Sequence, residues 1–259
     1  MLSKEQKTAI EYVLRKSIQN KLKNFKLEST SAPFHTRLLG KDRLALYTFI
    51  HFLNKNFETG IFEPVGLALA QKHFKMATSQ ATAGNQISST AQAEIQKIID
   101  GLVTATSTPN KKEEIERIRK VCQTGDMIKV KPTKVDLMFE SKDGAYFLFD
   151  IKTAKPNAGG FKEFKRTLLE WVAVVLANKP DAEIHTLIAI PYNPYEPEPY
   201  TRWTMRRMLD LENELKVADE FWDFLGGKNT YKDLLDCFER VGIELRDEID
   251  AYFKLFTKK

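Results

Sequence analysis

The chain has 259 residues, 42% of them hydrophobic, which excludes a disordered chain and suffices for one large domain with a sizeable core. Its formal net charge of +5 mildly favours a polyanionic partner. No apolar run approaches the length of a membrane span, and residues 1–7 lack an apolar signal-peptide core. Two cysteines without metal-site spacing, Cys122 and Cys237, are expected to be reduced and structural, as in a cytoplasmic protein.

The N-terminal part, residues 1–125, is predicted to be mainly helical. Ser3 and Gln6 suit a capping box ahead of an apolar helical face. A further helix is expected over Ala91–Leu102, and it carries an acidic residue, Glu94. An exposed position on the helix surface is the simpler explanation for this acid.

Two polar segments of the same part are predicted to be loops. Thr78–Thr90 is rich in small polar residues, which is typical of a surface loop. The alternative is a flexible arm that becomes ordered by hydrogen-bonding phosphates. Thr104–Lys112 is expected to be a second loop, and it ends in two lysines.

The central part, residues 126–200, alternates strand-like and helical segments. A tight-turn pattern at residues 142–144 separates two of the predicted strands, since Gly144 tolerates the positive φ that hairpin turns need. The predicted strands and helix, in chain order, are Met127–Lys131, Val135–Phe139, Tyr146–Lys152, Phe161–Asn178 and Ile184–Ile190. Together with the helices before them, these segments predict a mixed β-sheet flanked by helices, in the α/β class.

The predicted helix has one apolar stripe facing the core. Its members are Phe161, Phe164, Leu168, Val172, Val175 and Leu176. Three basic residues lie off that stripe: Lys162, Lys165 and Arg166.

Charged side chains gather at the end of the predicted hairpin. Because side chains alternate along a strand, Asp150 and Lys152 share one face, and antiparallel pairing can bring Asp136 beside Asp150. Burying such charges is costly unless they bind something, and two acids beside a lysine suit a divalent cation with an attacking water. The alternative is a solvated hairpin with charged residues on its wet face.

A stiff, aromatic segment follows the last predicted strand. Residues 191–200 contain four prolines, which prevent a helix there, and three tyrosines. With the basic residues just after it, this segment offers stacking and charge in one place, although a rigid surface loop explains it equally well.

The C-terminal part, residues 201–259, is predicted to be helical. Apolar residues at helical spacing form a packing or oligomerisation face at Leu234, Leu235, Phe238 and Val241. Residues 222–229 superficially resemble a P-loop, but Trp222 stands where the first glycine is needed and Asn229 replaces the final Ser or Thr, which excludes nucleotide-driven translocation by this motif.

The order strand, strand, helix, strand, with Asp136 and Asp150-Ile151-Lys152, resembles the catalytic core of the PD-(D/E)xK nuclease superfamily. Val135 stands where that motif usually has proline. The resemblance implies a restriction-endonuclease-like mixed sheet flanked by helices, with additional N- and C-terminal helices in one nuclease domain over residues 1–259. It also implies that Asp136, Asp150 and Lys152 are catalytic, and that Asp136, Asp150 and the Ile151 carbonyl hold Mg²⁺.

A self-contained nuclease domain without a P-loop is similar to type II restriction endonucleases. Residues 134–194 most resemble a subgroup that cuts interrupted GGNCC-type palindromes. This implies a prokaryotic homodimer that hydrolyses double-stranded DNA at a specific sequence. Some relatives supply an extra acid from an upstream helix, for which Glu94 is the candidate. Residues expected to contact DNA are Lys155, Asn157, Lys162, Arg166, Tyr192, Asn193, Tyr195 and Arg202.

Two alternatives remain open at the level of sequence. One is a nuclease of the same fold in DNA repair or recombination. The other is a catalytically inactive DNA-binding protein on this fold. The intact Asp136, Asp150 and Lys152 argue against the second, because an inactive protein has no chemical need to retain all three.

Overall fold

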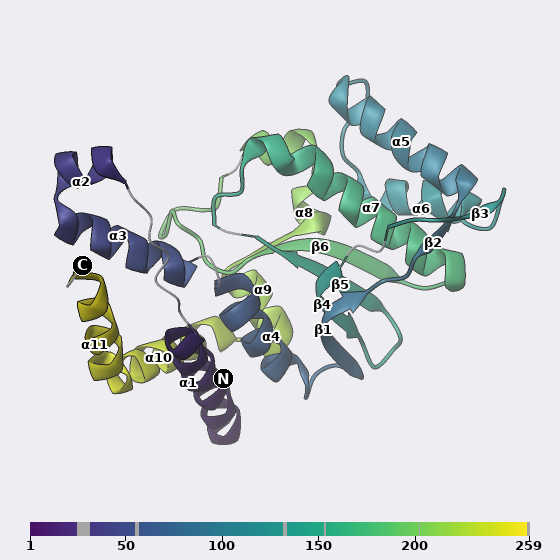
Figure 1. Cartoon of the computed structure of the whole chain (residues 1–259). Coiled ribbons are helices and arrows are strands. Elements are labelled where there is room, and N and C mark those ends of the chain that lie inside the picture. The colour runs from purple at the N-terminus through teal and green to yellow at the C-terminus, as the bar shows by residue number, and fades with distance from the viewer. Residues whose placement is uncertain (25–31, 55–56, 132–133, 153, 202, 258–259) are drawn as a thin grey trace. The chain divides into compact units, whose positions relative to one another are not determined.

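A computed structural model describes residues 1–24, 32–54, 57–131, 134–152, 154–201 and 203–257 (Figure 1). The chain divides into two compact units. The first unit combines Met1–Leu69 with Gly227–Lys259, and the second is the continuous stretch Ala70–Gly226. Among the described residues, no helix combines the length and the hydropathy needed to cross a bilayer.

The second unit is built on a mixed sheet, with five strands among its described residues. The order across the sheet is β1 (Met76–Thr82), β4 (Lys134–Glu140), β5 (Tyr146–Ile151), β6 (Ile184–Ile190) and β7 (Leu215–Val217). β1, β4 and β5 pair antiparallel, whereas β5, β6 and β7 pair parallel. The mixed sheet with flanking helices confirms the predicted fold class.

Helix α7 (Phe161–Asn178) connects the parallel strands β5 and β6 and packs along β6 (Figure 1). Its bounds are those predicted from the apolar stripe. β5 and β6 are buried at nearly every position, as expected of central strands that are covered on both faces. β4 alternates instead: Val135, Leu137 and Phe139 are fully buried, and the residues between them are partly exposed.

The remaining elements of this unit surround the sheet. They are a two-stranded ribbon of β2 (Gln86–Ser88) and β3 (Met127–Lys129), the helices α5 (Ser89–Val103), α6 (Lys111–Val121), α8 (Leu211–Glu214) and α9 (Asp219–Gly226), and the 3₁₀ segments η2 (Ala158–Gly160) and η3 (Trp203–Arg207). α5 and α6 pack on α7. Aromatic rings form much of the core on the other side, through contacts among Phe74, Phe139, Phe147, Phe149, Phe221 and Phe224.

The first unit is helical, as predicted for both ends of the chain. Its elements are α1 (Lys4–Asn24), α2 (Pro33–Leu39), α3 (Lys41–Asn54), a π-helical turn η1 (Glu58–Phe62), most of α4 (Glu63–Ala70), α10 (Thr230–Glu244) and α11 (Arg246–Thr257). The predicted capping box is present, with Ser3 N donating to Gln6 Oε1 at 3.0 Å and Gln6 N donating to Ser3 Oγ at 3.2 Å. α1 packs on α10 through the ion pairs Lys7–Asp233, Arg15–Glu244 and Glu11–Arg240.

Three local predictions were wrong. Thr78–Thr90 is not a loop, because its first residues belong to the strand β1 and Gln86–Ser88 forms β2. The predicted strand Met127–Lys131 exists only as β3, and β3 pairs with β2 rather than with the main sheet. Lys111 and Lys112 do not end a loop; they begin α6, where Asn110 Oδ1 caps the helix by accepting from Glu113 N at 3.1 Å.

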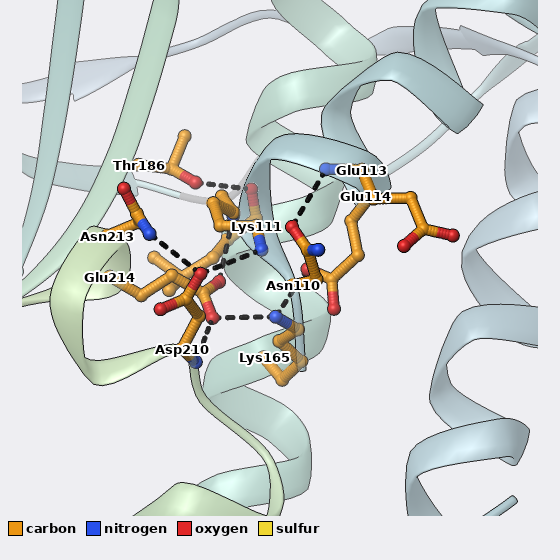
Figure 2. A network of polar contacts seen from close by, with 10 residues as sticks. Asn110, Lys111, Glu113, Glu114, Lys165, Thr186, Asp210, Asn213 and Glu214 are labelled. Carbon is orange, nitrogen blue, oxygen red and sulfur yellow. Dashed lines mark hydrogen bonds and ion pairs between the residues drawn. The ribbon is translucent and has the colours of Figure 1, made fainter. Parts of the chain in front are cut away.

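Lys165 lies off the apolar stripe of α7 and is nevertheless fully buried. Figure 2 shows it inside a cluster of two lysines and two glutamates whose side chains are at most 5% exposed. Lys165 Nζ lies 2.5 Å from Glu114 Oε2 and 2.6 Å from Glu214 Oε2. Lys111 Nζ lies 2.9 Å from Glu214 Oε1. This buried ionic cluster joins α6, α7 and α8.

The cluster is electrically balanced, with two charges of each sign. Burial alone would raise the pKa of Glu214, but the charges of Lys111 and Lys165 outweigh burial and lower it. The Glu214 carboxylate also accepts a hydrogen bond from Asp210 N at 2.8 Å, and Asp210 in turn accepts from Lys111 N at 3.0 Å (Figure 2). Full pairing is the condition under which such charges can be buried. The two cysteines, Cys122 and Cys237, are buried and form no disulfide, as predicted for reduced thiols.

Candidate active site

The hairpin of β4 and β5 brings the predicted catalytic side chains together. Its turn is closed by hydrogen bonds between Ser141 and Ala145, and Gly144 has φ +95°, where glycine is favoured. β4 and β5 pair from Glu140 and Tyr146 at the turn to Leu137 and Phe149. Continued by one residue, this register sets Asp136 opposite Asp150, as the sequence predicted.

The distances fix how these groups lie. Lys152 Nζ is 2.7 Å from Asp150 Oδ1, and the two side chains are 27% and 13% exposed. Asp136 Oδ2 accepts a hydrogen bond from Ile151 N at 2.8 Å, so the backbone of the second strand orients the first acid. Lys152 Nζ also lies over the ring of Phe164 on α7, 4.8 Å from its centroid. The three predicted catalytic residues therefore converge at the end of an apolar hairpin.

The protonation of Asp150 reflects this crowding. Its pKa is raised to about 6, mainly by burial; the charge of Lys152 offsets part of the effect of burial, and the neighbouring Asp136 adds to it. A carboxyl group in this state is costly to ionise unless additional positive charge is near. The site thus favours a cation beside its two carboxyl groups.

The donor set fits a hydrated, oxygen-preferring divalent cation. Two carboxylates at one point, accompanied by an ammonium group, suit Mg²⁺, which usually keeps several waters and takes only one or two carboxylates from a protein. No group of three His, Cys, Asp or Glu side chains suited to a metal is present among the described residues.

Glu94, the candidate auxiliary acid, does not join this pair in the described structure. Its carboxylate lies 2.7 Å from Arg117 Nη2 on α6 and 3.6 Å from Lys97 on its own helix. Glu94 thus ties α5 to α6 by ion pairing. A polar residue that the sequence analysis did not select is closer to the site: Gln80 Nε2 on β1 lies 3.4 Å from Asp136 Oδ1.

The proline-rich segment lies next to the loop that follows Lys152. Tyr200 Oη donates to Ala154 O at 3.0 Å, and Lys155 Nζ sits 5.0 Å from the ring centroid of Tyr195. Asn193 is used within the segment itself, since its Nδ2 donates to Glu198 O at 2.7 Å. These contacts hold the segment against the residues that directly follow Lys152. They also occupy several of its side chains in contacts within the protein.

The other residues expected to contact DNA differ in how accessible they are. Tyr192 is 49% exposed, and Lys162 is also exposed. Arg166 Nη2 donates to Gln96 Oε1 at 2.8 Å, and Asn157 caps the short helix η2 by accepting from Gly159 N. Arg202 lies outside the described residues.

Comparison with known proteins decides the family. A family model for the type II restriction endonuclease HinfI matches residues 2–242. The chain belongs to this HinfI family of type II restriction endonucleases. Its sheet and its Asp136, Asp150 and Lys152 are consistent with the PD-(D/E)xK superfamily that the sequence resembles.

Several type II restriction enzymes are similar in sequence to this chain over most of its length. The type II restriction enzyme HgiCII of Herpetosiphon aurantiacus is 25% identical over 224 residues, which cover 84% of this chain and 80% of that enzyme. HgiEI of the same organism is also 25% identical, with 84% and 79% covered. MjaII of Methanocaldococcus jannaschii is 25% identical over 210 residues, covering 76% of this chain and 55% of that enzyme.

These matches identify the activity as that of a type II restriction endonuclease, which acts on double-stranded DNA. Membership of the HinfI family also implies a divalent metal cofactor. The sequence left two alternatives open, a nuclease of DNA repair or recombination and an inactive DNA-binding protein. Neither the family nor the names of the similar enzymes favours either alternative.

Proposed function

We propose that this HinfI-family enzyme uses Mg²⁺ and that Asp136, Asp150 and Lys152 are its catalytic residues. The observation that carries the proposal is the convergence of these three side chains, with Lys152 Nζ 2.7 Å from Asp150 and Asp136 oriented by Ile151 N. Asp136, Asp150 and the backbone carbonyl of Ile151 would hold the cation. When bound, Mg²⁺ supplies a Lewis acid for the scissile phosphate and lowers the pKa of a coordinated water.

The side chains of the site have separate roles in hydrolysis. Asp136 and Asp150 provide the negative charge that retains the cation, and the hydrogen bond from Ile151 N keeps Asp136 in place. Lys152 offsets the charge that develops on the phosphoryl oxygens as water adds to phosphorus. The bond from phosphorus to the 3′ oxygen then breaks, which leaves a 5′-phosphate and a 3′-hydroxyl.

We further propose that the substrate is an interrupted palindrome of the GGNCC type, which the likeness of residues 134–194 to that subgroup supports. A palindrome presents two identical scissile phosphates, one on each strand, whereas one chain carries one set of Asp136, Asp150 and Lys152. A two-fold dimer matches this symmetry most simply.

The first unit offers a surface for such a dimer on α2 and α3. Among the described residues of that unit, large exposed apolar side chains are concentrated there: Phe34 (85% exposed), Leu38 (83%), Leu46, Tyr47 and Ile50. Exposed apolar patches of this kind often mark contact with another protein. The C-terminal helices, for which the sequence predicted a packing or oligomerisation face, use much of their apolar surface within the unit, because α10 packs on α1 and α11 packs on α3.

Mapping the cleaved ends tests the proposal. The purified protein is incubated with Mg²⁺ and a plasmid that carries one GGNCC-type site, and both ends of the product are sequenced and tested for a 5′-phosphate. We expect symmetric cuts at that site in both strands, and no cutting when EDTA is present. Cleavage that persists in EDTA would contradict the metal site, and cleavage confined to unrelated sequences would contradict the proposed target.

A further inference from the structure

Gln80 interrupts the edge of the catalytic sheet directly opposite the first catalytic acid. β1 pairs with β4 on both sides of it, at Ser79 with Leu137 and at Ala81 with Val135. The register therefore sets Gln80 opposite Asp136. Gln80 has φ +51°, in the left-handed region, and the pairing is broken at this one residue.

A left-handed glutamine within a strand is unfavourable. The Cβ atom of a non-glycine residue crowds the backbone in this region, so glycine, asparagine and aspartate are the residues that usually occupy it. Three other non-glycine residues of the described chain have positive φ, and all of them lie outside strands: Ala105, Ala218 and Asn229. Strain of this kind tends to persist at functional sites, where it aims a side chain that ordinary geometry would place elsewhere.

The side chain of Gln80 reaches the acid that it faces. Its Nε2 donates to Asp136 Oδ1 at 3.4 Å, a long hydrogen bond, while Ile151 N donates to Asp136 Oδ2 at 2.8 Å. The two oxygens of Asp136 are thus held from opposite neighbours, one on β1 and one on β5. Together these donors fix the plane of the carboxylate.

We propose that Gln80 is a positioning residue for the metal site and acts through Asp136. This inference rests on the proposed function, in which Asp136 is a metal ligand. Partners that orient a metal ligand in this way typically change metal affinity or activity by about 10- to 100-fold when they are removed. The left-handed backbone is what carries the amide to Asp136, at a cost in stability that the strand would otherwise avoid.

Two substitutions distinguish the effect of the left-handed backbone conformation from the effect of the Gln80 side-chain amide. Gln80→Gly keeps the left-handed conformation without strain but removes the side chain, and Gln80→Asn tolerates the conformation but has an amide one methylene shorter. Thr82→Ala, an exposed change on the same strand, is the matched control. Each protein is measured for its melting temperature without metal, for Mn²⁺ affinity by electron paramagnetic resonance, and for the Mg²⁺ concentration that gives half-maximal cleavage.

Gln80→Gly should melt at or above the temperature of the unchanged protein, yet bind Mn²⁺ about tenfold more weakly and need about tenfold more Mg²⁺. Gln80→Asn should show the same loss of metal affinity, and Thr82→Ala should show none. Unchanged Mn²⁺ affinity in both Gln80 variants would overturn the inference, as would a lower melting temperature in both, which would make Gln80 a structural residue. If the unchanged protein neither binds Mn²⁺ nor cuts DNA, the proposed function fails instead.

Discussion

Replacing Lys165 by methionine removes one charge from the buried ionic cluster of Figure 2 and keeps a side chain of similar length. Glu214 retains Lys111 Nζ at 2.9 Å, but Glu114 has no other ion pair among the described residues. Glu114 is then a buried carboxylate without a cation. Removing one partner of a buried ion pair costs about 3–5 kcal/mol, and for a domain of this size that corresponds to roughly 10 °C in melting temperature.

The assay is urea unfolding of the unchanged protein, Lys165→Met and the double variant Glu114→Leu with Lys165→Met. The double variant removes the stranded carboxylate, so we expect its free energy of unfolding to return to within about 1 kcal/mol of the starting value.

Two results would refute this reasoning. If Lys165→Met unfolds at the same urea concentration as the unchanged protein, the cluster does not depend on its central lysine. If the double variant is as unstable as the single variant, the loss comes from packing around the Lys165 side chain and not from an unpaired carboxylate.

Three further outcomes follow from the structure. Tyr192→Ala should weaken DNA binding by about 1–3 kcal/mol with no change in melting temperature, whereas Tyr195→Ala should mainly lower the melting temperature. If the two variants lose the same DNA affinity in fluorescence anisotropy and the same melting temperature, this distinction between the two tyrosines is wrong. Phe34→Glu should give a monomer in light scattering, and a persistent dimer would remove α2 from the interface. Because the pKa of Glu214 is lowered on folding, its contribution to stability is present above its unfolded pKa of about 4.3 and lost as the pH falls through the lower folded value. A urea midpoint that does not fall between pH 7 and pH 3 would contradict that assignment.

The parts of the fold that local patterns determine could be predicted from the sequence. The turn at residues 142–144, the alternation in Val135–Phe139 and the apolar stripe of Phe161–Asn178 are each encoded by neighbouring residues, and all three elements are observed. The meeting of Asp136 with Asp150 follows from the hairpin register, which the short turn fixes. Short-range information was therefore sufficient for the centre of the candidate site.

The features that could not be predicted from the sequence depend on residues that lie far apart along the chain. Met76–Thr82 lacks the alternation of large apolar and polar residues that predicts a strand, and it is a strand because β4 supplies its hydrogen bonds. Lys165 lies off the apolar stripe and looks exposed, but its two glutamates come from positions 51 and 49 residues away. Gln80 could not be selected, because its importance lies in a backbone conformation and a cross-strand neighbour that no local pattern encodes.

Cleavage and binding by Asp150→Asn, compared with the unchanged protein, test the catalytic assignment most directly. Both proteins are incubated with the same palindromic duplex, once with Ca²⁺ to measure binding and once with Mg²⁺ to measure cleavage in a single turnover. We expect Asp150→Asn to keep its fold and most of its DNA affinity but not to cut, because the residue serves the cation and does not contact bases. Cleavage by purified Asp150→Asn at the rate of the unchanged protein would contradict it.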